Sequence, residues 1–253
     1  MNGVEIIAAL DLPGSSLVDH RVPKKLLLEN GAPTATDKRY INEGIEELFW
    51  IAALKPTTIG VPEYRDQTRE YLEIAVLRLT LRAEAKAERL VELVHRAIPY
   101  PVLLLTKQGE PFGLSAAHKR WSQGEAEKSV LDGEVVSIEW DGTLDAKRWS
   151  DFLVALALGR QPRATLYELY QGWIDTLLAL QAARVTGVFS IAANAEHASA
   201  RRDALQEYAR LDVEIARLRA AAERETQLPR QVELNLELKR IEAAQAAASK
   251  RLR

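Results

Sequence analysis

The sequence has no cysteine, one methionine, four histidines and only 6% aromatic residues among its 253 positions. Without cysteine the chain can form neither a disulfide bond nor a thiolate metal site. Four histidines leave little material for a metal site built from imidazoles. We therefore expect no bound metal and no other cofactor.

Long apolar runs and an excess of basic charge are missing too. No stretch reaches the roughly 18 apolar residues of a membrane span. Residues 1–14 lack the basic start and the apolar core of a signal peptide, so we expect a cytoplasmic protein without membrane contact. Lys plus Arg number 34 and Asp plus Glu number 36, a net charge of -2. A site for a polyanion would therefore have to be a local patch.

The common catalytic motifs are also absent. We find no glycine-rich phosphate loop followed by Lys-Ser or Lys-Thr, no Gly-x-Ser-x-Gly, no His-Glu-x-x-His and no dinucleotide-binding fingerprint. The acidic residue followed by Glu-x-Lys of a nuclease core fails at Glu73 and again at Glu139. We assign no catalytic residue, leave enzymatic activity uncertain and favour a non-enzyme.

The clearest pattern in the chain predicts a β-hairpin. Residues 100–106 form a short apolar run that is typical of a strand buried on both faces. Gln108, Gly109, Glu110 and Pro111 have the composition of a turn. Residues 112–117 then alternate between large and small side chains, which indicates a half-buried second strand.

The segments before this hairpin mix helical and strand periodicity. Residues 37–54 predict a helix with Asp37 as its N-cap. Residues 57–61 predict a short strand, residues 71–81 a strand in the centre of the sheet, and residues 84–97 an amphipathic helix. After the hairpin, residues 130–140 predict another strand.

From residue 145 onward the pattern is helical. We expect helices at 145–158, 165–184 and 196–224, and a fourth helix that begins near Pro229, because proline is tolerated in the first turn of a helix. The predicted fold is α+β: a mixed, mainly antiparallel sheet with flanking helices, a helical segment, and a C-terminal helical hairpin or coiled coil. We place the domain boundaries at 1–144, 145–193 and 194–253.

Two basic clusters are candidates for binding nucleic acid. A strand end carries three potential cations and an aromatic ring, which suit a phosphate and a stacked base: His118, Lys119, Arg120 and Trp121. A second cluster contains Lys24 and Lys25. The alternative interpretation of both clusters is ordinary solvated surface, and the sequence does not show whether they meet in space.

The apolar line of the C-terminal helices is a candidate surface for a protein partner or for a second copy of the chain. Its members recur at spacings of three and four: Leu205, Leu211, Ile215, Leu218, Leu234, Leu238 and Ile241.

Several short motifs, in order along nearly the whole chain, resemble one bacterial family, domain of unknown function 4391. They are Val22-Pro-Lys-Lys-Leu, the Asp37-Lys38 segment reaching Trp50, Pro56-Thr-Thr-Ile, His95-Arg-Ala-Ile-Pro-Tyr-Pro, Ala117-His-Lys-Arg, Leu166-Tyr, Glu225-Thr-Gln and Val232-Glu-Leu-Asn-Leu-Glu-Leu-Lys.

That family has no established activity, so the resemblance implies no catalytic residue. Its members are encoded beside a helicase and a DNA methyltransferase in restriction-like defence islands. The resemblance therefore implies an accessory subunit of a DNA-directed anti-phage system with the helicase or the methyltransferase as partner. The alternatives are a nucleic-acid-binding protein that acts alone through the basic clusters on DNA or RNA, and a nuclease without a recognised motif.

Overall fold

The computed structural model describes residues 3–110, 112–124, 129–140 and 145–252. The chain divides into two compact units, residues 1–177 and 178–253. The division lies inside helix α7 (Leu166–Thr186), so the helical segment that we expected at 145–193 is shared between the two units.

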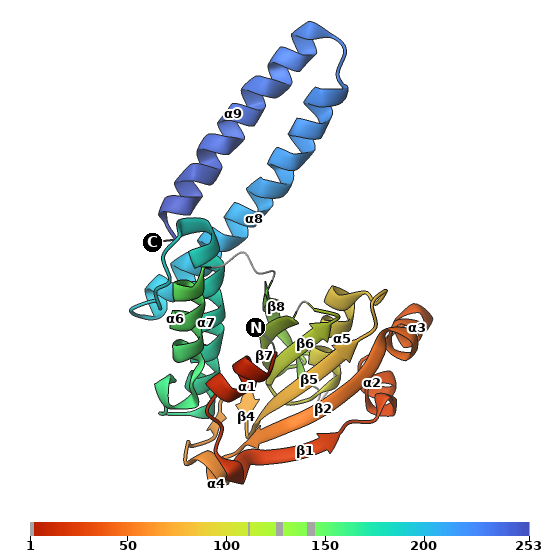
Figure 1. Ribbon diagram of the computed structural model, residues 1–253, viewed down its shortest axis with the longest axis vertical. Coiled ribbons are helices and arrows are strands. Elements are labelled where there is room, and N and C mark those ends of the chain that lie inside the picture. The colour runs from red at the N-terminus through yellow and green to blue at the C-terminus, as the bar shows by residue number, and fades with distance from the viewer. Residues whose placement is uncertain (1–2, 111, 125–128, 141–144, 253) are drawn as a thin grey trace. The chain divides into compact units, whose positions relative to one another are not determined.

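The first unit is built on a six-stranded sheet with the strand order β1-β2-β5-β6-β7-β8 (Figure 1). Its strands are β1 (Leu17–Arg21), β2 (Ile45–Leu54), β5 (Ile74–Leu81), β6 (Val102–Gln108), β7 (Phe112–Trp121) and β8 (Ser129–Trp140). Neighbours are antiparallel except β5 and β6, which are parallel and joined by helix α5 (Ala87–Ala97), the crossover that a parallel pair requires. The prediction of a mixed, mainly antiparallel α+β fold is confirmed.

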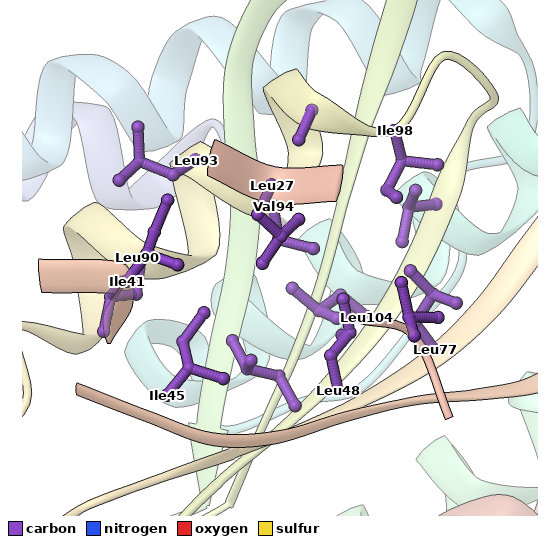
Figure 2. Close-up of a cluster of buried hydrophobic side chains, with 14 of the residues drawn as sticks. Leu27, Ile41, Ile45, Leu48, Leu77, Leu90, Leu93, Val94, Ile98 and Leu104 are labelled. Carbon is purple, nitrogen blue, oxygen red and sulfur yellow. The ribbon is translucent and has the colours of Figure 1, made fainter. Parts of the chain in front are cut away.

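Helices cover both faces of this sheet. Helices α2 (Lys24–Asn30), α3 (Ala35–Gly44) and α5 pack on one face, and Figure 2 shows their leucine, isoleucine and valine side chains gathered against those of β2, β5 and β6. On the other face the rings of Phe112 in β7 and Trp149 in α6 (Ala146–Leu156) lie 5.9 Å apart. The first half of α7 packs there too, and its Tyr170 hydroxyl donates to the carbonyl of Val102 at 2.7 Å.

The predicted hairpin and the central strand are confirmed. Strands β6 and β7 pair antiparallel, and Gly109 in their turn has φ +66°, which glycine adopts without strain. Pro111 lies outside the described residues. Strand β5 has β2 on one side and β6 on the other, in the middle of the sheet.

The helix expected over residues 37–54 is wrong in its second half. Helix α3 ends at Gly44, and residues 45–54 form β2, which pairs with β5 along nearly its whole length. Glutamate, leucine and alanine favour helix locally, but tertiary pairing overrides such weak preferences. The N-cap is also Thr34 rather than Asp37: its Oγ1 accepts from the Asp37 amide at 3.1 Å.

The strand expected at residues 57–61 is wrong as well. Pro56–Ile59 is a single helical turn, α4, in which Thr58 Oγ1 accepts from the Lys55 amide at 2.9 Å and which Gly60 ends at φ +66°. The sequence patterns gave no expectation for β1 or α2. The remaining short elements are α1 (Gly3–Ala9), two 3₁₀ turns (Gly14–Ser16 and Leu158–Arg160) and the paired β3 (Tyr64–Arg65) and β4 (Glu70–Tyr71).

The second unit contains the expected helical hairpin. Figure 1 shows α8 (Ala195–Arg224) and α9 (Leu228–Lys250) side by side. They run antiparallel, because Gln245 donates to Asp212 at 2.9 Å while Arg219 pairs with Glu242 at 2.7 Å. Pro229 lies in the first turn of α9, as predicted. Supercoiling of the two helices stays a prediction.

Candidate functional site

The four residues predicted to bind nucleic acid at the end of β7 are divided between the two faces of the sheet. Side chains of a strand alternate between its faces. His118 points to the face covered by α7, where its ring lies 5.1 Å from that of Tyr167. Lys119 points to the face covered by α5. The four side chains therefore do not form a single patch.

Lys119 is buried, with 2% of its surface exposed. Its amine Nζ donates to the backbone carbonyls of His95 and Ile98, at the C-terminal end of α5. Helices leave their last carbonyls without intrahelical donors, and a basic side chain satisfies them there. Burial lowers the pKa of Lys119 to about 7. The residue acts as an internal cap for α5 and is not available to bind a phosphate.

His118 belongs to a continuous hydrogen-bonded chain. Its Nδ1 lies 2.6 Å from the Tyr71 hydroxyl and its Nε2 lies 2.7 Å from Gln171 Oε1, while Gln171 Nε2 donates to Asp175 at 2.8 Å. Because Gln171 offers an oxygen, His118 Nε2 carries the proton and Nδ1 accepts from Tyr71. The Tyr71 hydroxyl also accepts from the Lys119 amide at 3.3 Å. This chain joins β4, β7 and α7 and orients the imidazole rigidly.

Arg120 is held by acidic and backbone groups. Its Nε lies 3.6 Å from Asp132, and Asp132 also pairs with Arg69 at 3.1 Å. Its Nη1 donates to the carbonyl of Trp121 at 3.2 Å. Trp121 is half-buried and, together with Lys119 and Tyr100, lines a surface hollow of about 120 Å³. A hollow of this size is too small for a nucleotide.

Lys24 and Lys25 lie at the opposite corner of the sheet. Lys24 follows β1 and donates to the carbonyl of Asn42 at 3.2 Å, beside the C-terminal end of β5. His118 lies beyond the N-terminal end of β5 and β6, since Leu104 pairs with Ser115. Strands β1 and β7 are four positions apart, which is roughly 19 Å at about 4.8 Å per strand. The two basic clusters therefore do not converge.

The surroundings of the second cluster mix cations with carboxylates. Burial, followed by the charges of Arg82 and Arg21, lowers the pKa of Lys24. Lys25 is 3.6 Å from Glu29 on the same helix. The hollow of about 440 Å³ beside Lys24 includes both cations and carboxylates in its lining: His20, Arg21, Lys24, Glu46 and Glu47.

A serine and a histidine are adjacent on the α5 face of the sheet. Ser115 Oγ lies 2.9 Å from His95 Nε2, the distance expected of a nucleophile and its base. His95 is fully buried, however, and burial together with the charge of Lys119 lowers its pKa to about 3. Such an imidazole accepts a proton poorly at neutral pH. The pair therefore ties α5 to β7, and we assign it no catalytic role.

The apolar line that we expected to bind a partner instead packs inside the hairpin. Leu211, Ile215 and Leu218 are exposed by only 3%, 4% and 1%. On α9, Leu234, Leu238 and Ile241 are partly buried, and they hold that helix against α8. Leu205 of α8 packs with Ala182 and Val185 of α7 and with Leu252. The predicted line is therefore not a free docking surface in this conformation.

A different apolar stripe lies on the outer side of α9. Leu228, Val232 and Leu236 are 71%, 49% and 63% exposed. Their spacing of four residues places them on one face of the helix, over about 12 Å. Val232 and Leu236 are each two positions from a residue that packs against α8, Leu234 or Leu238, and Leu228 lies one helical turn before Val232. Residues two positions apart point to opposite sides of a helix, so the stripe faces away from α8. Sequence reasoning missed it because it weighed only the longer line.

The tyrosine network was also missed, since Tyr71, Tyr167 and Tyr170 have the spacing of ordinary apolar residues. Only their hydroxyl contacts distinguish them. Among the described residues, no three His, Asp or Glu side chains are grouped so that they could hold a metal ion. None of the described helices has the length and apolar character needed to cross a membrane.

Comparison with known proteins gives a family but no activity. Neither the curated proteins nor the solved structures contain a match. The model of one family, described as domain of unknown function (DUF4391), matches residues 10–244, which include the whole sheet and most of the hairpin. The chain therefore belongs to the DUF4391 family of domains of unknown function.

Proposed function

We propose that this protein is a non-catalytic interaction subunit, which binds another polypeptide through the outer side of its helical hairpin. The observation that carries the proposal is the exposed stripe of Leu228, Val232 and Leu236, three large apolar side chains in one row on α9. The other side of this helix already packs against α8. Isolated apolar residues are common on protein surfaces, but contiguous ones mark interaction sites.

The nature of the partner is proposed from the family resemblance. A helicase or a DNA methyltransferase of a restriction-like anti-phage system is the expected partner, in the cytoplasm where such enzymes meet DNA. The protein would then place or hold these enzymes and would leave the chemistry to them. Direct binding of nucleic acid is less well supported, because Lys119 is buried and the two basic clusters lie at opposite corners of the sheet.

The test is a triple substitution, Leu228→Gln, Val232→Gln and Leu236→Gln, with association to the co-encoded helicase and methyltransferase measured by pull-down and titration. Glutamine keeps helix propensity, so the hairpin should remain folded. Each apolar side chain buried in an interface contributes about 1–2 kcal/mol, so the three together should weaken binding at least about a hundredfold.

Val213→Gln is the matched control, because Val213 is 72% exposed on the outer side of α8. It should bind like the wild type. Equal affinity of the triple variant and the wild type for every co-encoded protein would refute the proposal.

A further inference from the structure

The first unit contains a groove that the hairpin proposal does not use. It lies between α5 and the adjacent face of β6, β7 and β8, and it has a volume of about 860 Å³. One wall is the outer side of α5, with Glu88, Val91 and Glu92. The floor is made by small side chains of the sheet, because Gly113 and Ser115 leave room where larger residues would fill the space.

The groove runs along an edge of the sheet. β8 is the last strand, and within the described residues only β7 pairs with it. The strand is 12 residues long, and most of its residues are exposed or half-buried. An edge of this kind offers backbone donors and acceptors to an additional strand.

The lining of the groove is acidic. It contains four glutamates and one arginine: Glu88, Glu92, Glu134, Glu139 and Arg96. Glu92 is compensated by Arg96 and by Arg89, each at 2.6 Å. Glu88 and Glu134 therefore carry the acidic charge that an occupant meets. Such a surface attracts cations and repels nucleic acid.

The lining is also partly apolar. Val91, Leu131 and Val135 are half-buried along the groove and provide apolar contacts.

We propose that the outer edge of β8, which forms one rim of this groove, binds an extended basic segment of a partner protein as an additional strand. Alternating side chains of such a strand point to opposite faces of the sheet, so lysine or arginine residues on the α5 side can reach Glu88 and Glu134 at the groove, while the residues between them face the other side. The backbone of the segment provides the hydrogen bonds, and the acidic lining selects its charge. This inference concerns the sheet unit and does not depend on the stripe of α9.

The probe is a fluorescein-labelled nonapeptide of alternating lysine and valine, and the matched control is the same peptide with glutamate in place of lysine. Fluorescence anisotropy should show saturable binding of the basic peptide to the full-length protein and none of the acidic peptide. Affinity should fall as salt is raised, because the glutamates lie near the surface. Hydrogen exchange should slow at the amides of β8 on binding.

The decisive variant combines Glu88→Lys with Glu134→Lys, both of which are exposed and distant from the core. Binding of the basic peptide should weaken about tenfold, since each exposed charge pair contributes modestly and is here reversed. The control combines Glu63→Lys with Glu84→Lys, which change the net charge equally at exposed positions outside the groove lining. It should bind like the wild type.

Equal weakening by both double variants would mean attraction to net charge alone and would overturn the proposal. So would unchanged hydrogen exchange in β8, or failure of the basic peptide to bind at any concentration. In that case the acidic residues of β8 only prevent association between sheet edges. The glutamine variant of the α9 stripe should bind the peptide normally, so the two proposals can fail separately.

Discussion

Lys119 makes the stability of the protein depend on pH in a way that a single substitution can test. Its ordinary pKa is 10.5, and burial lowers that pKa to about 7 in the folded protein. Between pH 7 and 10.5 the unfolded chain therefore binds a proton at this position that the folded chain does not. The free energy of unfolding rises with pH wherever the unfolded state binds more protons.

The size of the effect follows from the shift. One pKa unit corresponds to about 1.4 kcal/mol. The full shift of 10.5 - 7 = 3.5 units sets an upper bound of about 5 kcal/mol, and the interval from pH 7.5 to 9.5 covers at most about 2.7 kcal/mol of it. The carbonyls of His95 and Ile98 favour the charged form and reduce this amount. We expect about 1–2.5 kcal/mol over that interval.

The perturbation is Lys119→Met, which keeps the length and apolar body of the side chain and removes the amine. Urea unfolding followed by circular dichroism at pH 7.5, 8.5 and 9.5 gives the free energy of unfolding for each protein. Subtracting the free energy of unfolding of the variant from that of the wild type at each pH removes the contributions of all other titrating groups. The wild type should gain stability relative to the variant by about 1–2.5 kcal/mol as the pH rises.

Lys25→Met is the control, because Lys25 is exposed and makes only a 3.6 Å pair with Glu29. Its free energy of unfolding should change with pH in the same way as that of the wild type. If the curve of Lys119→Met also runs parallel to the wild type, Lys119 is charged in the folded protein, and the assignment of a neutral internal cap is refuted.

Two other substitutions test contacts that hold the sheet unit together. The ion pair with Arg89, at 2.8 and 3.1 Å, and the Thr34 contact lower the pKa of Asp37 from 3.8 to about 2. The wild type should therefore lose stability as the pH falls from about 4 to 2. Asp37→Asn should be less stable at neutral pH, and its stability in thermal unfolding should depend less on pH over that acidic range. Tyr170→Phe removes the hydroxyl that donates to the Val102 carbonyl at 2.7 Å and accepts from the Ala117 amide at 2.9 Å. Both backbone groups stay buried and lose this partner, so the free energy of unfolding in urea titrations should fall by about 2–4 kcal/mol. Little change in Asp37→Asn would show that its ion pair does not stabilise α3 against α5. Little change in Tyr170→Phe would show that its hydroxyl does not stabilise β6 and β7.

The fold was predictable where the periodicity of the sequence matches one type of structure. The apolar run ending at Thr106, the turn at Gly109 and the long spacing of α8 and α9 each have a single sensible interpretation. Residues 45–54 have no such single interpretation. Their leucines and alanines have helical spacing, yet pairing with β5 places them in strand β2. Such long-range pairing is not encoded in any local window.

The candidate site was less predictable for a related reason. The sequence brings His118, Lys119 and Arg120 together as neighbours, but a strand sends neighbours to opposite faces, and the burial of Lys119 depends on the position of α5. Likewise, Leu211 and Ile215 are apolar at helical spacing whether they face α9 or a partner. The exposed stripe with Leu228 and Leu236 can be recognised only once it is known which side of α9 packs against α8.

The most direct test of the central claim, that the hairpin is the surface through which this protein joins a complex, is cross-linking mass spectrometry of the protein isolated from its native host. Lys239 and Lys250 are exposed on α9 and serve as reporters. We expect cross-links from Lys239 to another polypeptide, and their loss in the glutamine variant of Leu228, Val232 and Leu236. A complex whose cross-links all come from the sheet unit, with none from α9, would contradict it.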